Sequence, residues 1–508
     1  MKKKYYTLFI IYFITLLGIY CNSDTTKISE GEKLARIHCA SCHAFTEPSL
    51  LNKNTWSEGV LPKMAEMMYV DAYYNPYSTN GPEGDMSQTR AAPQNLFPVE
   101  KWNKIYNYYI SNAPEDPISR KEDLPVIQQG LKFFTSHSIY DKVSLPVTTL
   151  VKFDTTTKKI FFADGSAKKL FVLDQQFKVI DSMEIPLGVT DINIMQKGIK
   201  AISMGILKPS DEKLGKLSLI SENKTSIDLL DTLQRPVHAI YADLNADNKE
   251  DIILCEFGFR KGGLSWLENK GNNQFEKHVL RALPGATRTE VYDFNSDGKP
   301  DIAALMAQGD EGIFIYYNEG KGKFREERVI QFPPSYGSNH FQLFDFNQDG
   351  YIDILTTNGD NGDSSVILKA YHGIRIFLNN QKNQYTERIF LPVYGVQKAI
   401  PADFDNDGDF DLVSIAFFPD YEKLPEESFI YWENTGNYQY KRYTFSGVTD
   451  GRWWTMDAGD IDGDGDKDII LGNAFFSFGN VPQSLKEKWG KRPLSAIILE
   501  NTLYNKNH

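Results

Sequence analysis

Two cysteines and a histidine stand together near the N-terminus, in the segment Cys39-Ala40-Ser41-Cys42-His43. The C-x-x-C-H spacing is that of a c-type haem attachment sequence, because two thiols on one helical turn can bond both vinyl groups of a porphyrin. The adjacent histidine then directs its imidazole at the iron as an axial ligand. The motif predicts one covalently attached haem c held by Cys39, Cys42 and His43.

Two other uses of this cysteine pair are considered. A structural zinc site needs a second pair of ligands, and no other cysteine or paired histidine lies nearby in the sequence. A thioredoxin-like redox pair uses the two thiols but does not require His43. Cys255 follows three apolar residues in a strand-like run, where a buried thiol behaves as a small hydrophobic group. Haem attachment is therefore the prediction for Cys39 and Cys42.

A second set of chemically distinctive residues forms a nine-residue acidic loop that recurs five times, with starts 50, 52, 58 and 57 residues apart. Oxygens at positions 1, 3, 5 and 9, with a main-chain carbonyl at position 7, can wrap one Ca²⁺. Gly298, Gly350, Gly408 and Gly465 occupy position 6, where the turn requires a positive φ, and Asn248 in the first copy predicts the least regular site. The sequence predicts up to five calcium sites, with the ligands Asp243, Asn245, Asp247, Asp251, Asp293, Asn295, Asp297, Asp301, Asp345, Asn347, Asp349, Asp353, Asp403, Asp405, Asp407, Asp411, Asp460, Asp462, Asp464 and Asp468.

The segments on either side of these loops are predicted to be β-strands. The loops are not EF-hands, because position 12 of the first copy is Leu254 rather than glutamate. A strand precedes each loop, as at 239–242, an apolar strand follows it, and third and fourth segments such as 312–318 and 324–330 complete the unit. Four strands in about 50 residues make a propeller blade. The repeats resemble the FG-GAP/VCBS family, known from integrin-like propellers and many bacterial surface proteins.

Two degenerate blades without the acidic loop precede the five repeats. The first has strands expected at Thr149–Phe153, Lys159–Phe162, Lys169–Leu173 and Lys178–Ile185, and the second lies between Asn193 and Leu230. Two plus five blades predict an all-β, seven-bladed propeller over residues 147–508, with 117–146 as the linker leading into it. Little chain follows 496–499, so we expect the last blade to take its outer strand from residues 120–146.

The haem motif requires a helical setting. Ser29 and Glu32 form a capping-box pattern at the start of an amphipathic helix, and 99–111 carries Trp102, Ile105 and other aromatic residues at helical spacing. A helix bearing C-x-x-C-H, a middle region and an aromatic closing helix resembles a small all-α class I cytochrome c. The resemblance covers residues 27–114, and it implies a cytochrome domain at 22–116.

The sixth iron ligand remains a choice between methionines. The segment from Trp56 to Met64 resembles the W-x-x-x-V-L-P-x-M stretch of cytochrome modules fused to propellers. Met86 instead lies in the loop before the last helix, where many small cytochromes place their methionine. Met64 is preferred and Met86 is the alternative, while Met67 and Met68 are expected to be packing residues. Methionine–histidine ligation suits electron transfer, whereas an open site suits small-molecule binding.

The N-terminus carries the pattern of an export signal. Lys2–Lys4 precede an apolar run of 16 residues, Tyr5–Tyr20, which is shorter than the roughly 20 residues of a membrane-spanning helix. The following Cys21 resembles a bacterial lipoprotein cleavage site, although Tyr20 is bulkier than the usual residue. The resemblance implies a signal peptide at 1–21 and a location in the periplasm or at the cell surface. The lipid on Cys21 would then be the one membrane attachment.

Charge and loop placement limit the partners. The net charge is −12, with no basic block beyond the first residues, which argues against a nucleic-acid partner. The propeller face opposite the acidic loops is expected to be rich in polar and aromatic side chains and to suit a carbohydrate or another polar ligand. Its residues are Arg235, His238, Glu256, Arg260, Arg288, Asp310, Glu311, Asn339, His340, Asp360, Asn361, Asp363, Lys398, Asp420, Arg452, Trp453, Trp454 and Asn473.

Three functions are compatible with this organisation. The first is an exported electron carrier that docks a redox partner protein. The second is a quinoprotein-like sugar or alcohol dehydrogenase, but each acidic loop supplies its own ligand set and leaves no calcium ion to coordinate a quinone. The third is a surface adhesion or glycan-binding module. No Ser-His-Asp arrangement, Walker loop or dinucleotide fingerprint occurs, so no catalytic residue is predicted and electron transfer is the preferred function.

Overall fold

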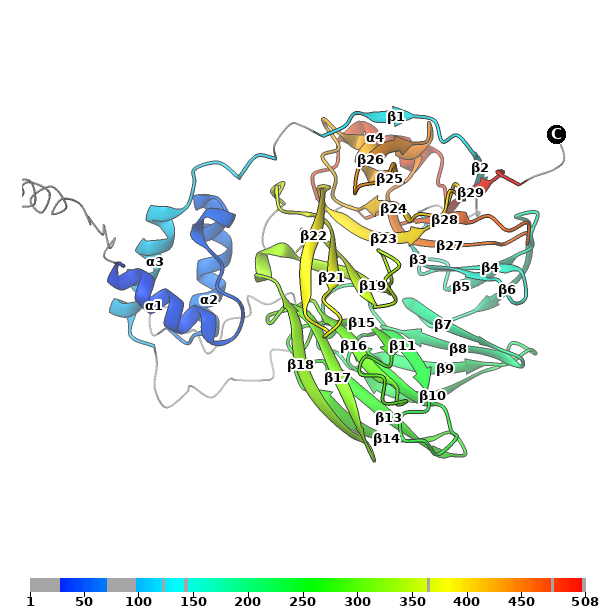
Figure 1. The fold of residues 1–508 in the computed structure, drawn as a ribbon, viewed down its shortest axis with the longest axis horizontal. Coiled ribbons are helices and arrows are strands. Elements are labelled where there is room, and N and C mark those ends of the chain that lie inside the picture. The colour runs from blue at the N-terminus through cyan, green and yellow to red at the C-terminus, as the bar shows by residue number, and fades with distance from the viewer. Residues whose placement is uncertain are drawn as a thin grey trace, which may run out of the picture.

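The protein is described from a computed structural model, which covers residues 28–70, 97–120, 124–140, 145–362, 366–476 and 479–504. A helical module, residues 28–113, lies beside a ring of β-sheets (Figure 1). The predicted signal peptide 1–21, with Cys21, and the alternative ligand Met86 fall outside the described residues. No helix in the covered ranges is both long enough and apolar enough to cross a bilayer.

The helical module is built from short helices. Glu32 donates its main-chain N–H to the Ser29 hydroxyl (3.1 Å), so the first helix begins where the capping pattern predicts. A side chain at Gly31 would overlap the Lys104 carbonyl oxygen, so glycine lets the first and last helices cross closely. The elements are α1 (Glu30–His38), η1 (Cys39–Ser41), η2 (Pro48–Leu50), the π-turn η3 (Thr55–Val60), α2 (Leu61–Met67) and α3 (Val99–Asn112).

Seven sheets follow the module, as the repeat spacing predicts; each has four antiparallel strands, and the sixth has a parallel fifth strand as well. The two blades without acidic loops come first: β3 (Thr148–Asp154), β4 (Lys159–Asp164), β5 (Lys169–Leu173) and β6 (Val179–Glu184), then β7 (Val189–Met195), β8 (Gly198–Ser203), β9 (Gly215–Ile220) and β10 (Ser226–Leu233). The first blade matches its predicted strands closely, and the second begins a few residues earlier than predicted.

The five blades with acidic loops have the same meander order. The second strand of each is buried along its whole length, because neighbouring blades cover both of its faces. Their strands are β11 (Pro236–Ala242), β12 (Asp251–Glu256), β13 (Gly263–Gly271), β14 (Gln274–Arg281); β15 (Ala286–Tyr292), β16 (Asp301–Met306), β17 (Gly312–Gly320), β18 (Lys323–Gln331); β19 (Ser338–Phe344), β20 (Asp353–Asn358), β21 (Gly373–Asn379), β22 (Tyr385–Pro392); β23 (Val396–Ala402), β24 (Asp411–Ala416), β25 (Phe429–Asn434), β26 (Tyr440–Thr444); and β27 (Trp453–Gly459), β28 (Asp468–Asn473), β29 (Ala496–Asn501).

The ring closes through the chain ahead of the first blade. β2 (Phe134–Ile139) pairs antiparallel with β29, with Phe134 opposite Asn501, and becomes the outer strand of the last sheet. This confirms the prediction that residues 120–146 supply that strand. The first strands of successive blades also contact one another around the whole ring, including β27 with β3. The structure is therefore a closed seven-bladed propeller.

Two features of this closure were not predicted. β1 (Ile127–Gln129) adds a parallel fifth strand to the sixth blade, beside β26. A short helix, α4 (Gln483–Lys491), interrupts the last blade between β28 and β29. The 3₁₀ turns η4 (Pro334–Tyr336), η5 (Pro425–Ser428) and η6 (Val448–Asp450) lie in other connections.

The helical module contacts the propeller through the segment after β20. Tyr371 donates its hydroxyl to the Leu50 carbonyl (3.1 Å), and Ile367 packs against the apolar core of the module. The connecting segment is also held, because Arg120 pairs with the fully buried Glu427 (2.9 Å) and Arg442 reaches the same carboxylate (3.4 Å). The helical module therefore packs against one side of the propeller (Figure 1).

Candidate functional site

The C-x-x-C-H segment forms the turn that ends α1. Cys39 opens the 3₁₀ turn η1 and is 2 % exposed, whereas Cys42 is exposed on the far side of the same turn. Burial raises the pKa of the Cys39 thiol to about 11, and the neighbouring Tyr109 hydroxyl opposes that shift. The two sulfur atoms are not joined in a disulfide, so both remain available as thiols.

His43 has a defined ring orientation. Its Nδ1 lies 2.8 Å from the Ala44 carbonyl oxygen, and a carbonyl only accepts, so Nδ1 carries the proton. In the neutral ring Nε2 is then the lone-pair nitrogen, which is the atom a metal would use. Tyr109 donates to the Thr46 carbonyl (3.1 Å) and thereby ties the chain just beyond His43 to α3.

The methionines differ in their surroundings. Met64 and Met68 pack against the module core that also contains Cys39, while Met67 is 74 % exposed. Trp56 begins the predicted stretch leading to Met64 and is buried. Its ring is tilted against that of Tyr109, with ring centroids 4.3 Å apart, and its indole N–H donates to the Pro48 carbonyl (2.8 Å). Met64 and the Cys39 turn thus share one apolar core.

Each acidic loop folds around the carboxylate at position 1. In the second copy Asp293 accepts the main-chain N–H groups of Asp297 (3.1 Å) and Gly298 (2.7 Å). The first, third and fourth copies make the same bond to the residue at position 6, and the last copy does not. Position 6 has a positive φ in all five loops, including φ 61° at Asn248, as the sequence predicts. The side chains at positions 1, 3 and 5 are therefore directed into each turn.

The structure brings three carboxylates together in two of the loops. The oxygen atoms of Asp403, Asp405 and Asp407 lie within 4.8 Å of one another, and those of Asp460, Asp462 and Asp464 do the same. Desolvation raises the pKa of Asp405 and Asp462, and the neighbouring carboxylates add to the shift. Such a cluster of like charges is stabilised by a cation.

The position-9 aspartates have a different environment. Both oxygens of the buried Asp301 accept main-chain N–H groups, from Phe294 (3.0 Å) and Asn318 (2.7 Å). The equivalent residues in the other copies do the same, and burial raises the pKa of Asp353 to about 6 and those of Asp411 and Asp468 to about 7. These carboxylates fasten the loop to the third strand of the blade, in addition to any role as calcium ligands.

Sequence reasoning missed an asparagine at the end of each third strand. In the fourth blade Asn318 donates its Nδ2 to the carbonyls of Leu244 (2.8 Å), in the preceding blade, and Pro300 (3.2 Å). Its Oδ1 accepts the N–H of Gly320 (2.9 Å). At the equivalent positions, Asn501 also donates to a carbonyl of the preceding blade, that of Phe404, whereas Asn269, Asn379 and Asn434 donate to a carbonyl of their own blade. Their recurrence at the end of an apolar strand is the signal that was present in the sequence.

Several residues expected on the opposite face are structural. Trp453 is fully buried and donates its indole N–H to the Val448 carbonyl (2.8 Å), so it offers no ring surface to a ligand. Glu256 is buried and pairs with Lys277, and Arg235 donates to the Gly258 carbonyl (2.9 Å). Trp454 is partly exposed and contacts the rings of Phe417 and Phe476. Asp363 lies outside the described residues.

Other residues from the same set meet near the ring axis, on the first strands. His238 pairs through Nδ1 with Asp191 (2.9 Å) and faces the Thr289 carbonyl with Nε2 (3.1 Å). Burial, together with the charges of Arg288, Lys398 and His238, depresses the pKa of His340. Burial lowers the pKa of Lys398 to about 8. The axis thus holds neighbouring groups of both signs.

Comparison with protein families identifies the repeats. A model described as FG-GAP-like repeat matches residues 243–304 and 293–356, which run from the first acidic loop, in the third blade, into β20 of the fifth blade. The chain carries FG-GAP-like repeats. The two matches cover the first three acidic loops, and the sixth and seventh blades, outside the matches, have the same acidic loop between their first two strands. No curated protein matches the sequence.

The solved structures that match the chain share little sequence with it. The N-terminal domain of Nup159 is 11% identical, with a TM-score of 0.43, over 75% of this chain and 99% of that one. A catalytically inactive virginiamycin B lyase from Staphylococcus aureus, solved with quinupristin, is 11% identical, with a TM-score of 0.45, over 72% and 99%. A putative 6-phosphogluconolactonase from Bacteroides uniformis is 11% identical, with a TM-score of 0.39, over 59% and 85%.

Proposed function

We propose that the protein is an exported electron-transfer protein, with haem c attached in the helical module and calcium ions in the FG-GAP-like loops. The mature chain would be held at a membrane by a lipid on Cys21, in the periplasm or at the cell surface. Residues 22–116 would form the cytochrome domain, and the propeller would dock a redox partner protein or a polar ligand such as a carbohydrate.

The observation that carries this proposal is the orientation of His43. The Ala44 carbonyl holds the proton on Nδ1, which leaves Nε2 as the atom that would coordinate the iron. Cys42 immediately precedes His43, and Cys39 lies one turn earlier. A haem bound here would supply one-electron chemistry. The chain would supply two thioether attachments, the axial imidazole and, from the same apolar core, the Met64 thioether.

The residues around the turn would give the site rigidity. The Tyr109 hydroxyl holds the Thr46 carbonyl, and the Gly31 crossing fixes α1 against α3. A metal ligand that does not move between oxidation states lowers the reorganisation that electron transfer requires. Cys42 is exposed, so its thiol can be reached from solvent.

Calcium binding is supported by the loop geometry. The position-1, 3 and 5 side chains converge in the last two FG-GAP-like blades, and the positive φ at position 6 turns the chain around a common centre in all five. Bound ions would offset the burial and the carboxylate repulsion that together raise the pKa values of Asp405 and Asp462.

The test is haem attachment in protein produced with full c-type maturation machinery. We expect the purified protein to give a pyridine haemochrome spectrum with one haem per chain, and Cys39→Ser/Cys42→Ser to abolish it while the propeller stays folded by circular dichroism. Cys255→Ala is the matched control, because that thiol is buried in the third blade, and it should retain full haem. Colourless wild-type protein would refute the proposal.

A further inference from the structure

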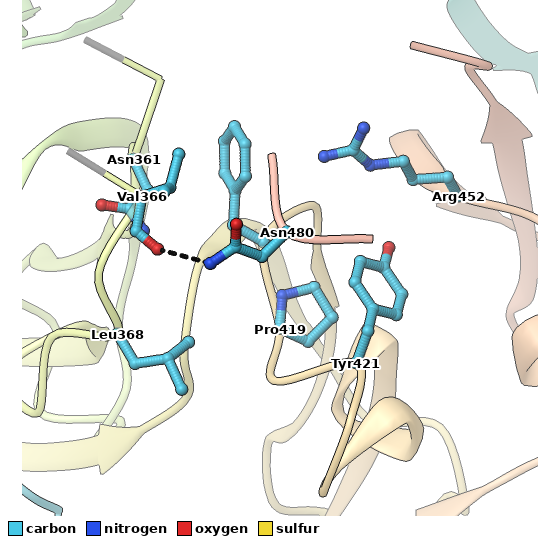
Figure 2. A pocket seen from close by; sticks show the side chains of 8 residues that line it. Asn361, Val366, Leu368, Pro419, Tyr421, Arg452 and Asn480 are labelled. Carbon is cyan, nitrogen blue, oxygen red and sulfur yellow. Dashed lines mark hydrogen bonds between the residues drawn. The ribbon is translucent and has the colours of Figure 1, made fainter. Parts of the chain in front are cut away.

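A small cavity, whose lining side chains are drawn in Figure 2, lies on the propeller face opposite the acidic loops. Its walls come from the segments after β20, β24 and β28 and from the residue before β27. Val366 and Leu368 line it and flank Ile367, which packs against the module core. The cavity is therefore next to the junction between the two parts of the chain.

Two buried polar atoms of the residues lining this cavity, the Tyr421 hydroxyl and Oδ1 of Asn361, have no hydrogen-bond partner in the described part of the chain, and the Tyr421 hydroxyl is the donor of the two. Tyr421 is 5% exposed, and its hydroxyl makes no hydrogen bond to any described residue. Figure 2 shows the hydroxyl directed toward the side of the cavity where the Arg452 guanidinium lies. Burial raises the pKa of Tyr421 to about 12, so the hydroxyl keeps its proton at neutral pH and remains a donor. A group that accepts a hydrogen bond is what this atom lacks.

The other groups of the cavity define the charge and size of that acceptor. Arg452 is fully buried, and its guanidinium lies 3.7 Å over the Phe417 ring and donates to the Phe476 carbonyl (2.9 Å), so it brings positive charge to the wall. Pro419 and Leu368 supply apolar walls, and the exposed Asn480 stands at the mouth. The space open to the centres of water-sized groups is about 20 Å³, enough for one or two such groups but not for a sugar ring.

We propose that this cavity binds the carboxylate group of a small organic acid, with the Tyr421 hydroxyl and the Arg452 guanidinium as donors. The rest of the acid would project past Asn480 toward solvent. This names the ligand class for the polar site on that face, and it rests on that part of the proposed function. It does not depend on the haem, so the two proposals can fail separately.

The experiment titrates acetate, with acetamide as the neutral analogue of the same shape, into the full mature protein at constant ionic strength and pH 7. We expect saturable acetate binding by calorimetry and no binding of acetamide. Tyr421→Phe should weaken acetate binding about tenfold, because a hydrogen bond to a charged group is lost. The unliganded variant should melt at the wild-type temperature, because the hydroxyl has no partner to lose.

Tyr440→Phe is the matched control. Its hydroxyl is also buried and has no hydrogen-bond partner among the described residues, but it lies on β26 of the sixth blade and does not line the cavity, so acetate binding should be unchanged. Equal binding of acetate and acetamide would identify the occupant as water or a neutral group and overturn the proposal. So would equal acetate affinity in wild type and Tyr421→Phe. If the same protein carries one haem per chain, either result would overturn the carboxylate site alone and would not affect the electron-transfer proposal.

Discussion

Replacing Asn318 tests whether its hydrogen bond to the preceding blade stabilises the propeller. Asn318 is 1% exposed, and its amide makes three hydrogen bonds: two as donor, to the carbonyls of Leu244 and Pro300, and one as acceptor, from the Gly320 N–H. The Leu244 carbonyl belongs to the preceding blade, in a residue that is 2% exposed. Asn318→Ala therefore removes an inter-blade bond and leaves a buried carbonyl without a donor.

The size of the effect follows from these three bonds. A buried group left unsatisfied costs about 1–3 kcal/mol, and a partly solvated bond costs about 0.5–1.5 kcal/mol. One of the first kind and two of the second give a loss of about 2–6 kcal/mol in the free energy of unfolding. Asn318→Asp should cost more, because a carboxylate oxygen would face the two carbonyl oxygens and stand near the Asp301 carboxylate.

The assay is equilibrium urea unfolding followed by far-UV circular dichroism, in saturating Ca²⁺. Glu319→Ala is the control, because that side chain is the exposed neighbour on the same strand and should change stability by less than about 0.5 kcal/mol. The reasoning is refuted if Asn318→Ala loses less than 1 kcal/mol. It is equally refuted if Asn318→Asp is no less stable than Asn318→Ala.

Three further predictions concern calcium, the linker and ring closure. EDTA should lower the melting temperature, and the stabilisation that Ca²⁺ gives should shrink between pH 7.5 and pH 5.5. Burial raises the pKa of Asp411 and Asp468 to about 7, so in the ion-free folded state these carboxyl groups take up a proton as the pH falls. Ca²⁺ must then displace that proton, and it should bind about 30-fold more weakly at pH 5.5. Melting curves with and without Ca²⁺ at each pH measure this, and an unchanged difference contradicts it. Glu427→Gln should cost about 3 kcal/mol in urea unfolding, because the Arg120 and Arg442 guanidinium groups lose their buried counter-ion, whereas the exposed Glu422→Gln should have no effect. A chain starting at residue 118 should fold and one starting at 141 should not, as judged by circular dichroism and gel filtration, since the second lacks β2.

The blade pattern was predictable because it is local. The acidic loop and the strands on either side of it lie within about 20 residues, so strand alternation and the required turn residues appear together in the sequence. Gly298 and Gly465 mark turns that only a positive φ allows, and the structure has that φ at both. The same holds for Ser29, whose capping role depends on a residue three positions away.

Contacts between distant segments were less visible. The pairing of Phe134 with Asn501, the reach of Asn318 into the preceding blade and the burial of Trp453 all depend on how the sheets pack around the axis. A polar or aromatic side chain at the end of a strand has the same sequence context whether it faces solvent or the next blade. For that reason the predicted ligand face was partly occupied by structural residues.

The sequence by itself determined the C-x-x-C-H turn, the five acidic loops and the number of blades, because each rests on residue types at short, fixed spacing. Only the tertiary structure decided that Nδ1 of His43 is held by Ala44, which residues of 120–146 pair with β29, and that the Tyr421 hydroxyl lies near Arg452 with no hydrogen-bond partner among the described residues. These features depend on side-chain directions and on contacts between segments that are far apart in the sequence. Side-chain burial and long-range strand pairing are determined by the packing of the complete domain, so a short stretch of sequence does not reveal them.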